Sequence, residues 1–155
     1  MTEPEESPAA PAHPGQQRTK SARTIGIIIA VLGAIFLVAG VATYAIVSNT
    51  LAQEHITVSD DARWFAGKDV KGPFTAYSQA DIIATHAEEI AGGKTYSELA
   101  QDDPNRATVM NASFLRASLF TSVVAFGVAA FVAVMGVVLM LLGWGLVRLS
   151  GPRSA

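Results

Sequence analysis

Two uncharged stretches decide the fold of this chain: residues 24–53, TIGIIIAVLGAIFLVAGVATYAIVSNTLAQ, and residues 117–147, ASLFTSVVAFGVAAFVAVMGVVLMLLGWGLV. Each holds about 30 residues between charged neighbours, and a helix of that length can cross a bilayer. Every charged residue lies in the N-terminal segment, in the connection or in the last eight residues. The apolar residues are therefore pooled in two blocks, which predicts two transmembrane helices and no large soluble core.

The first block predicts a retained anchor and not a cleaved signal peptide. Its apolar run, residues 25–47, has 23 residues and rises about 34 Å as a helix, against about 30 Å of hydrocarbon in a bilayer. The apolar core of a signal peptide is shorter, about 7 to 15 residues. We therefore predict transmembrane helices over residues 24–48 and 117–147.

The basic residues predict the orientation of these helices, because lysine and arginine beside a span resist translocation. They stand before the first span and after the second, at Arg18, Lys20, Arg23, Arg148 and Arg153. The connection, residues 48–118, has six basic and ten acidic residues, and its first 15 residues contain no lysine or arginine. We predict a multi-pass plasma-membrane protein with both termini in the cytoplasm.

The whole pattern predicts a mainly α fold, an antiparallel transmembrane helical hairpin with a small α-rich extracytoplasmic module between the spans. Residues 1–23, which contain four prolines and little to bury, are expected to be a disordered cytoplasmic tail. Residues 49–116 form the module, and residues 148–155 form a short cytoplasmic tail.

One helix of the module is predicted over residues 79–91. Ser78 can cap its first turn, Asp81 stands at the capping-box position, and Gly92-Gly93 marks its end. Residues 71–74, Lys-Gly-Pro-Phe, are interpreted as a turn before this helix.

Shorter signals surround that helix. Ile56 and Val58 favour a short strand, and a second short helix is expected to start at Thr95. After Asp102-Asp103-Pro104, residues 106–116 are compatible with a helix that continues directly into the second span as one rod of more than 40 residues.

Small residues recur every seven positions in both spans, which predicts close packing of the two helices. In an antiparallel hairpin they pair at matched depth: Gly26 with Gly143, Gly33 with Gly136, and Gly40 with Ala129. Such a seam lets two backbones approach where lipid offers no hydrophobic driving force. Self-association through the small-x3-small ladders that start at Gly26 and Ala125 stays open as an alternative use.

The chain offers few groups for catalysis. Tyr44 is the one ionisable side chain within the spans, which argues against a transporter that works alone. With no cysteine, His55 and His86 are the candidate metal ligands of the connection, and no glycines of a nucleophile elbow surround its serines. We predict no catalytic residue, no metal, no cofactor and no nucleic-acid partner.

Two long segments carry a family resemblance. Residues 56–81, ITVSDDARWFAGKDVKGPFTAYSQAD, and residues 91–127, AGGKTYSELAQDDPNRATVMNASFLRASLFTSVVAFG, resemble small two-span membrane proteins of actinobacteria. Many of these are labelled aromatic ring-opening dioxygenases of the LigA type, which implies a soluble enzyme with non-haem iron. Because this chain has no ligand cluster beyond two histidines, we interpret the label as a misassignment and carry over no catalytic residue.

The leading functional hypothesis is a non-enzymatic accessory or interaction subunit of the cell envelope, bound to the lipid bilayer and to a membrane-protein partner or a second copy. Aromatic residues give large contact area at low ordering cost. The candidate contacts, which can alternatively form the core of the module, are Trp64, Phe65, Phe74, Tyr77 and Tyr96. The alternatives are the iron-dependent dioxygenase and a homo-oligomeric channel or transporter component.

Overall fold

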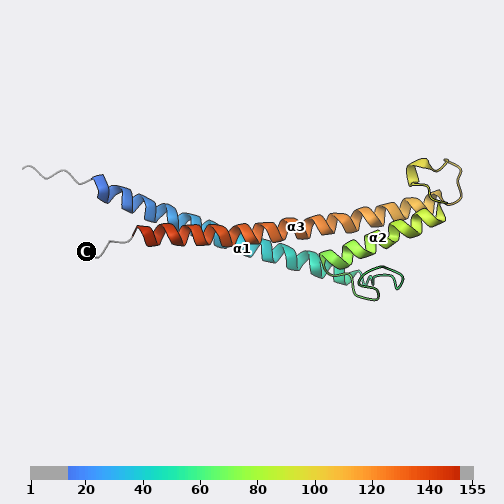
Figure 1. The fold of residues 1–155 in the computed structure, drawn as a ribbon, viewed down its shortest axis with the longest axis horizontal. Helices are drawn as coiled ribbons and strands as arrows, with labels where there is room; N and C mark the ends of the chain where they lie inside the picture. The colour runs from blue at the N-terminus through green and yellow to red at the C-terminus, as the bar shows by residue number, and fades with distance from the viewer. Residues whose placement is uncertain (1–13, 151–155) are drawn as a thin grey trace, which may run out of the picture. The chain divides into compact units, whose positions relative to one another are not determined.

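A computed structural model describes the backbone of residues 14–150 and the side chains of residues 21–150. The elements, in order, are the helix α1 (Pro14–Gln53), the helix α2 (Pro73–Ile90), the 3-10 helix η1 (Tyr96–Glu98) and the helix α3 (Arg106–Leu149) (Figure 1). The fold is mainly α, as predicted, and the described residues form no strand. Two compact units divide the chain: a smaller unit, residues 1–35 with 135–155, and a larger unit, residues 36–134.

Helix α1 begins earlier than the sequence predicts. Residues 14–23 were expected to belong to a disordered tail, but the helix starts at Pro14. Proline suits a first helical turn, and the Gln, Arg, Lys and Ala residues that follow extend an existing helix at little cost. The remaining tail, residues 1–13, lies outside the described residues. The helix ends at Gln53, where His55 takes the left-handed conformation with a φ of 52°.

The segment between α1 and α2 forms a bridge where a strand was predicted. Thr57 and Asp69 make an isolated antiparallel bridge. The Val70 amide donates to the Ile56 carbonyl at 2.8 Å, and the Val58 amide donates to the Lys68 carbonyl at 2.9 Å. The chain therefore folds back on itself over too few residues to build a sheet.

Two predictions about helix α2, its first residue and its cap, are wrong. It begins at Pro73 and not near residue 79, so residues 71–74 form a helix start, with Gly72 as the N-cap. Proline at the first helical position explains this start. Ser78 is not a cap, because it lies inside the helix, where its hydroxyl donates to the Trp64 carbonyl at 2.5 Å. The predicted end is confirmed: α2 stops at Ile90, before the two left-handed glycines.

The segment after α2 connects it to the start of α3. Thr95 caps η1, and its amide donates to the Glu98 carboxylate at 2.8 Å, which confirms a short helical turn at this place. Helix α3 starts at Arg106, so Pro104 precedes its first turn. The Asn105 side-chain amide donates to the Ile90 carbonyl at 3.1 Å and joins the two helix ends. The predicted rod is confirmed, because α3 runs unbroken for 44 residues.

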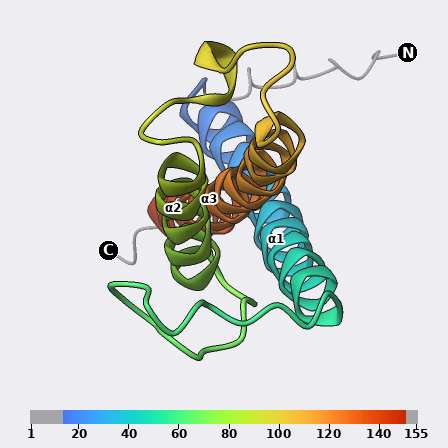
Figure 2. The same cartoon turned by 90° about the vertical axis from the view of Figure 1, so that its right-hand side faces the viewer.

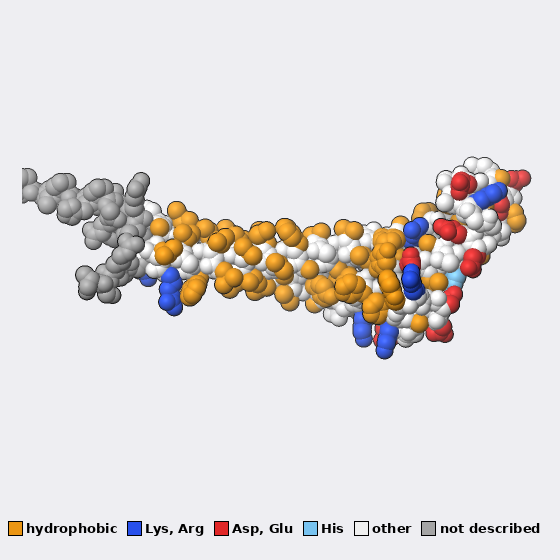
Figure 3. Space-filling view, viewed as in Figure 1, with side chains coloured by type: hydrophobic (Ala, Val, Ile, Leu, Met, Phe, Trp, Pro, Cys, Tyr) orange, Lys and Arg blue, Asp and Glu red, His pale blue; other side chains and the backbone are white. Residues whose placement is uncertain are grey.

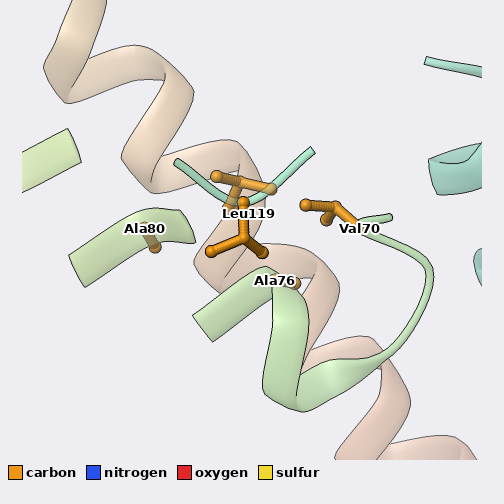
Figure 4. Close-up of a cluster of buried hydrophobic side chains, with 5 residues drawn as sticks. Val70, Ala76, Ala80 and Leu119 are labelled. Carbon is orange, nitrogen blue, oxygen red and sulfur yellow. The ribbon is translucent and has the colours of Figure 1, made fainter. Parts of the chain in front are cut away.

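The larger unit is held together by a small core against α3. In Figure 2, α2 lies beside α3, and the segment before α2 passes below both. The buried side chains that join these elements are Val58, Val70, Ala76, Ala80 and Leu119, four of which Figure 4 labels. A second cluster, of Ala91, Leu99 and Val109, lies near the start of α3. Alanine at the α2 contact lets the two helices approach closely.

Candidate functional site

In the smaller unit, the glycines predicted to pair lie against each other with no room for a side chain. A Cβ built on Gly26 would lie 2.8 Å from the Gly143 carbonyl oxygen, and one on Gly33 would lie 2.7 Å from the Gly136 carbonyl oxygen. One built on Gly143 would lie 2.5 Å from the Gly26 carbonyl oxygen and 2.6 Å from the Ala30 amide nitrogen. Since real Cβ contacts do not become this short, the two backbones touch here.

The third pair lies in the larger unit and has the same geometry. A Cβ on Gly40 would lie 2.6 Å from both the Ala129 carbonyl oxygen and the Ala133 amide nitrogen. One turn further along α1, the Tyr44 ring lies 4.7 Å from the Phe126 ring, and Phe126 is fully buried. We call the six residues of the three pairs the glycine seam: Gly26, Gly33, Gly40, Ala129, Gly136 and Gly143. Several residues of the small-x3-small ladders thus already face the other helix of the same chain.

Within the uncharged blocks of α1 and α3, most large side chains away from the seam are apolar and exposed. Both helices are long and apolar enough to cross a membrane, over Ser21–Gln53 and Arg106–Leu149. Only 17% of the most apolar window of each helix is buried, whereas the core helix of a soluble protein would be mostly buried. Within the larger unit, Figure 3 shows hydrophobic side chains along the helices and charged ones gathered around the module. Exposed apolar surface of this kind is compatible with a membrane environment.

Four of the five candidate contact aromatics lie on the surface of the module. Trp64, Phe65 and Tyr77 are exposed, and Phe74 is the most exposed of them at 73%. Tyr96 differs, because it packs against the Ala91 cluster and lies under the Arg106 guanidinium, 4.5 Å from its ring centre. The alternative prediction, that these aromatics form the core of the module, is wrong for the first four, since small aliphatic side chains fill that core.

A shallow hollow of about 560 Å³ lies beside the N-terminus of α2. We call four of its lining residues the base of the module: Phe65, Lys68, Lys71 and Phe74. Tyr44 of α1 also lines the hollow. The Ser48 hydroxyl of α1 donates to the Lys71 carbonyl at 2.7 Å, and this hydrogen bond connects the segment before α2 to α1. The Asp69 carboxylate lies in the same hollow, 3.6 Å from the Lys71 ammonium.

A second depression is an apolar groove between α2 and α3, of about 280 Å³. We call it the α2–α3 groove; it is lined by Ile83, His86, Ala87, Ile90, Thr108, Asn111, Ala112 and Leu115. Ile90, Leu115 and the neighbouring Phe114 are exposed. Helix α3 therefore covers only part of the apolar face of α2.

The two candidate metal ligands lie in different settings. The His86 Nε2 lies 2.6 Å from an Asp61 carboxylate oxygen, and this hydrogen bond holds the pKa of Asp61 below its ordinary value of 3.8. His55 follows the end of α1. Among the described residues, no group of three or more His, Cys, Asp and Glu side chains lies close enough to hold a metal ion.

Sequence reasoning missed both depressions, although a signal for one was present. The four residues Phe65, Lys68, Lys71 and Phe74 recur at a spacing of three in the sequence, Phe65-x2-Lys68-x2-Lys71-x2-Phe74. Arg106, at the start of α3, contacts the segment after α2 through the Tyr96 ring and through a 2.5 Å hydrogen bond to the Leu99 carbonyl. Asp103 accepts a hydrogen bond from the Asn105 amide at 2.8 Å.

No protein-family model matches the chain, and neither a curated protein nor a solved structure is detectably similar to it. What the protein does is therefore inferred from its own residues and their geometry.

Proposed function

We propose that this protein is a two-span plasma-membrane protein whose module, residues 49–116, lies outside the cytoplasm and docks a membrane partner without catalysing a reaction. The observation that carries the proposal is the contrast between the two sides of α1 and α3. Their backbones touch along the glycine seam, while long apolar side chains cover the remaining surface. Lipid satisfies that surface, and a helix satisfies its own backbone in lipid.

The charges support the proposed orientation. Basic residues precede the first span and follow the second, and the connection is rich in acidic residues. Positively charged flanks are retained in the cytoplasm, so both termini lie there and the module lies outside.

The α2–α3 groove supports the docking role. Ile90, Phe114 and Leu115 are exposed apolar side chains that precede the uncharged block of the second span. Apolar side chains gathered at one depression outside the spans are typical of an interaction site. The occupant that fits is an apolar helix or extended segment of a neighbouring membrane protein.

Membrane topology is tested by cysteine labelling, for which the chain is well suited because it has no cysteine. Ser97→Cys places a thiol on an exposed residue of the module, and Ser7→Cys places one in the N-terminal segment. A membrane-impermeant maleimide should label Ser97→Cys on intact cells and Ser7→Cys only after permeabilisation. The reverse pattern would overturn the orientation, and release of the protein by alkaline carbonate would overturn membrane insertion.

Docking is tested by photocrosslinking in native membranes. A photoreactive phenylalanine at Leu115, in the groove, should yield one defined adduct, and the same group at Glu89, exposed on α2 outside the groove lining, should not. An adduct with a second copy of the chain would replace the accessory role by self-assembly. Equal adducts at both positions, or none at Leu115, would remove the groove as the docking site.

A further inference from the structure

We propose that the base of the module lies in the lipid headgroup layer and binds the phosphate of an anionic phospholipid. The inference rests on the membrane placement proposed above and concerns a surface separate from the α2–α3 groove. It assigns Lys68 and Lys71 to the phosphate and Phe65 and Phe74 to the upper part of the acyl chains.

The depth of this surface follows from its contacts with the two spans. Ser48 is the first residue after the apolar run 25–47, and its hydroxyl bonds to the Lys71 carbonyl at 2.7 Å. On α3, the Tyr77 ring meets the Phe120 ring at 5.7 Å. Arg116, the last charged residue before the uncharged block, lies over the same Phe120 ring. Both helices therefore place the start of α2 where hydrocarbon meets headgroups.

The side chains near the start of α2 are of the types that are typical of a membrane–water interface. Phe74 projects from the first turn of α2 and is 73% exposed, and Phe65 is also exposed. Phe65 adopts a φ of 61°, a left-handed conformation that is rare for a bulky residue and concentrates at functional positions. Aromatic rings beside lysines are a pattern of membrane interfaces, where the ring is buried and the ammonium remains in water.

The charge of the hollow fits a phosphodiester with a single negative charge. The hollow contains Lys68, Lys71 and Asp69. Asp69 lies 3.6 Å from the Lys71 ammonium, while Lys68 has no carboxylate partner in the part of the chain that the structure describes. One positive charge is thus left, and the N-terminus of the 18-residue helix α2 adds to it. A zwitterionic headgroup would bring an ammonium into this positive field, so an anionic lipid is favoured.

The charges elsewhere in the module contrast with this. Between the start of α2 and Arg116, the basic residues are Lys94 and Arg106, and they are outnumbered by acidic residues. The acidic residues of this stretch are Asp81, Glu88, Glu89, Glu98, Asp102 and Asp103. An anionic bilayer would attract Lys68 and Lys71 and repel the acidic residues between Asp81 and Asp103.

The test compares full-length variants in phosphatidylcholine bilayers that contain a minor fraction of spin-labelled phosphatidylglycerol. The wild type should prefer phosphatidylglycerol over spin-labelled phosphatidylcholine, and the double variant Lys68→Gln with Lys71→Gln should lower this preference roughly tenfold. Lys94→Gln is the matched control, an exposed lysine of the same module, and should keep the preference. Lys68→Arg with Lys71→Arg, which keeps both charges, should also keep it.

Two outcomes would overturn the inference: a double glutamine variant that keeps the preference, or a Lys94→Gln variant that loses as much. Carbonate extraction of the same samples separates this failure from failure of the proposed function. An inserted protein without lipid preference would refute the headgroup site alone, whereas a protein that is not inserted would refute both.

Discussion

The two helix pairs of this protein, α1 with α3 and α2 with α3, are packed in different ways. Along the glycine seam, backbone meets backbone, and Gly33 has no space even for a methyl group. Between α2 and α3, Ala76 and Ala80 make a tight contact at one end, and the helices leave a groove of about 280 Å³ at the other. Helices that meet in lipid depend on close packing, because lipid supplies no hydrophobic driving force between them. Helices that meet in water gain from burial and can leave a gap for a partner.

The largest effect is expected from a bulky side chain in the glycine seam, which would separate α1 from α3. Gly33→Leu should destabilise the folded protein by about 3 kcal/mol, because the two nearest contacts of the new side chain are the backbones of Gly136 and Met140, which cannot move aside easily. Gly145→Leu, in the same unit with open space around its Cβ position, should cost little. Unfolding in mixed micelles measures both. Equal losses would mean that the seam does not hold the helices together.

The next change enlarges a side chain at the tight contact between α2 and α3. Ala76 is fully buried against α3, so Ala76→Leu should destabilise the module by about 2 kcal/mol through overpacking. It should also push α2 away from α3 and raise amide exchange in α2. Thr85→Leu, at an exposed position of the same helix, serves as the control. Unchanged exchange in Ala76→Leu would show that the contact between α2 and α3 tolerates a larger side chain.

A smaller effect is expected beyond the open end of the α2–α3 groove. Arg106→Ala removes a hydrogen bond to the Leu99 carbonyl and a ring contact with Tyr96, with a loss of about 1–2 kcal/mol. Faster hydrogen exchange over residues 91–99 should report it. Arg106→Lys should recover only part of the protection, because an ammonium lacks the planar stacking of a guanidinium. Full recovery would indicate that charge alone matters.

The smallest effect concerns Asp61 and leaves both helix pairs intact. The hydrogen bond from His86 lowers the pKa of Asp61 below 3.8. A lowered folded-state pKa contributes stability above the ordinary value, and this contribution is lost as the pH falls through the folded-state pKa. His86→Ala should raise the pKa of Asp61, as read by carboxyl NMR titration. Glu98, whose pKa is lowered by hydrogen bonds from Thr95, should not change. An unchanged Asp61 pKa would show that the pair does not persist in solution.

Sequence reasoning succeeded for α1 and α3, where one signal dominates. The uncharged blocks lie within α1 and α3, and the period of seven places the glycines of the seam at matched depths, although the start of α1 at Pro14 was not predicted. It failed at the start of α2, where two starts compete. Ser78 and Asp81 match the pattern of a helix cap, but the helix begins earlier, at Pro73. The Ser78 hydroxyl instead donates a hydrogen bond to the Trp64 carbonyl. Only the folded chain shows that distant contact.

The two depressions could not be predicted for a related reason. The base of the module is assembled when Ser48 at the end of α1 bonds to Lys71, 23 positions along the chain. The groove depends on how closely Ala76 and Ala80 let α2 approach α3. Neither property is local, so the aromatic side chains could be assigned either to a core or to a surface.

Helix α3 continues without interruption from the module into its apolar block. The eleven residues Arg106–Arg116 rise about 16 Å as a helix, at 1.5 Å per residue. In the proposed membrane placement, this stretch of α3 sets the height of the α2–α3 groove above the bilayer. Under the proposed docking role, a partner in the groove would lie within about 16 Å of the lipid surface.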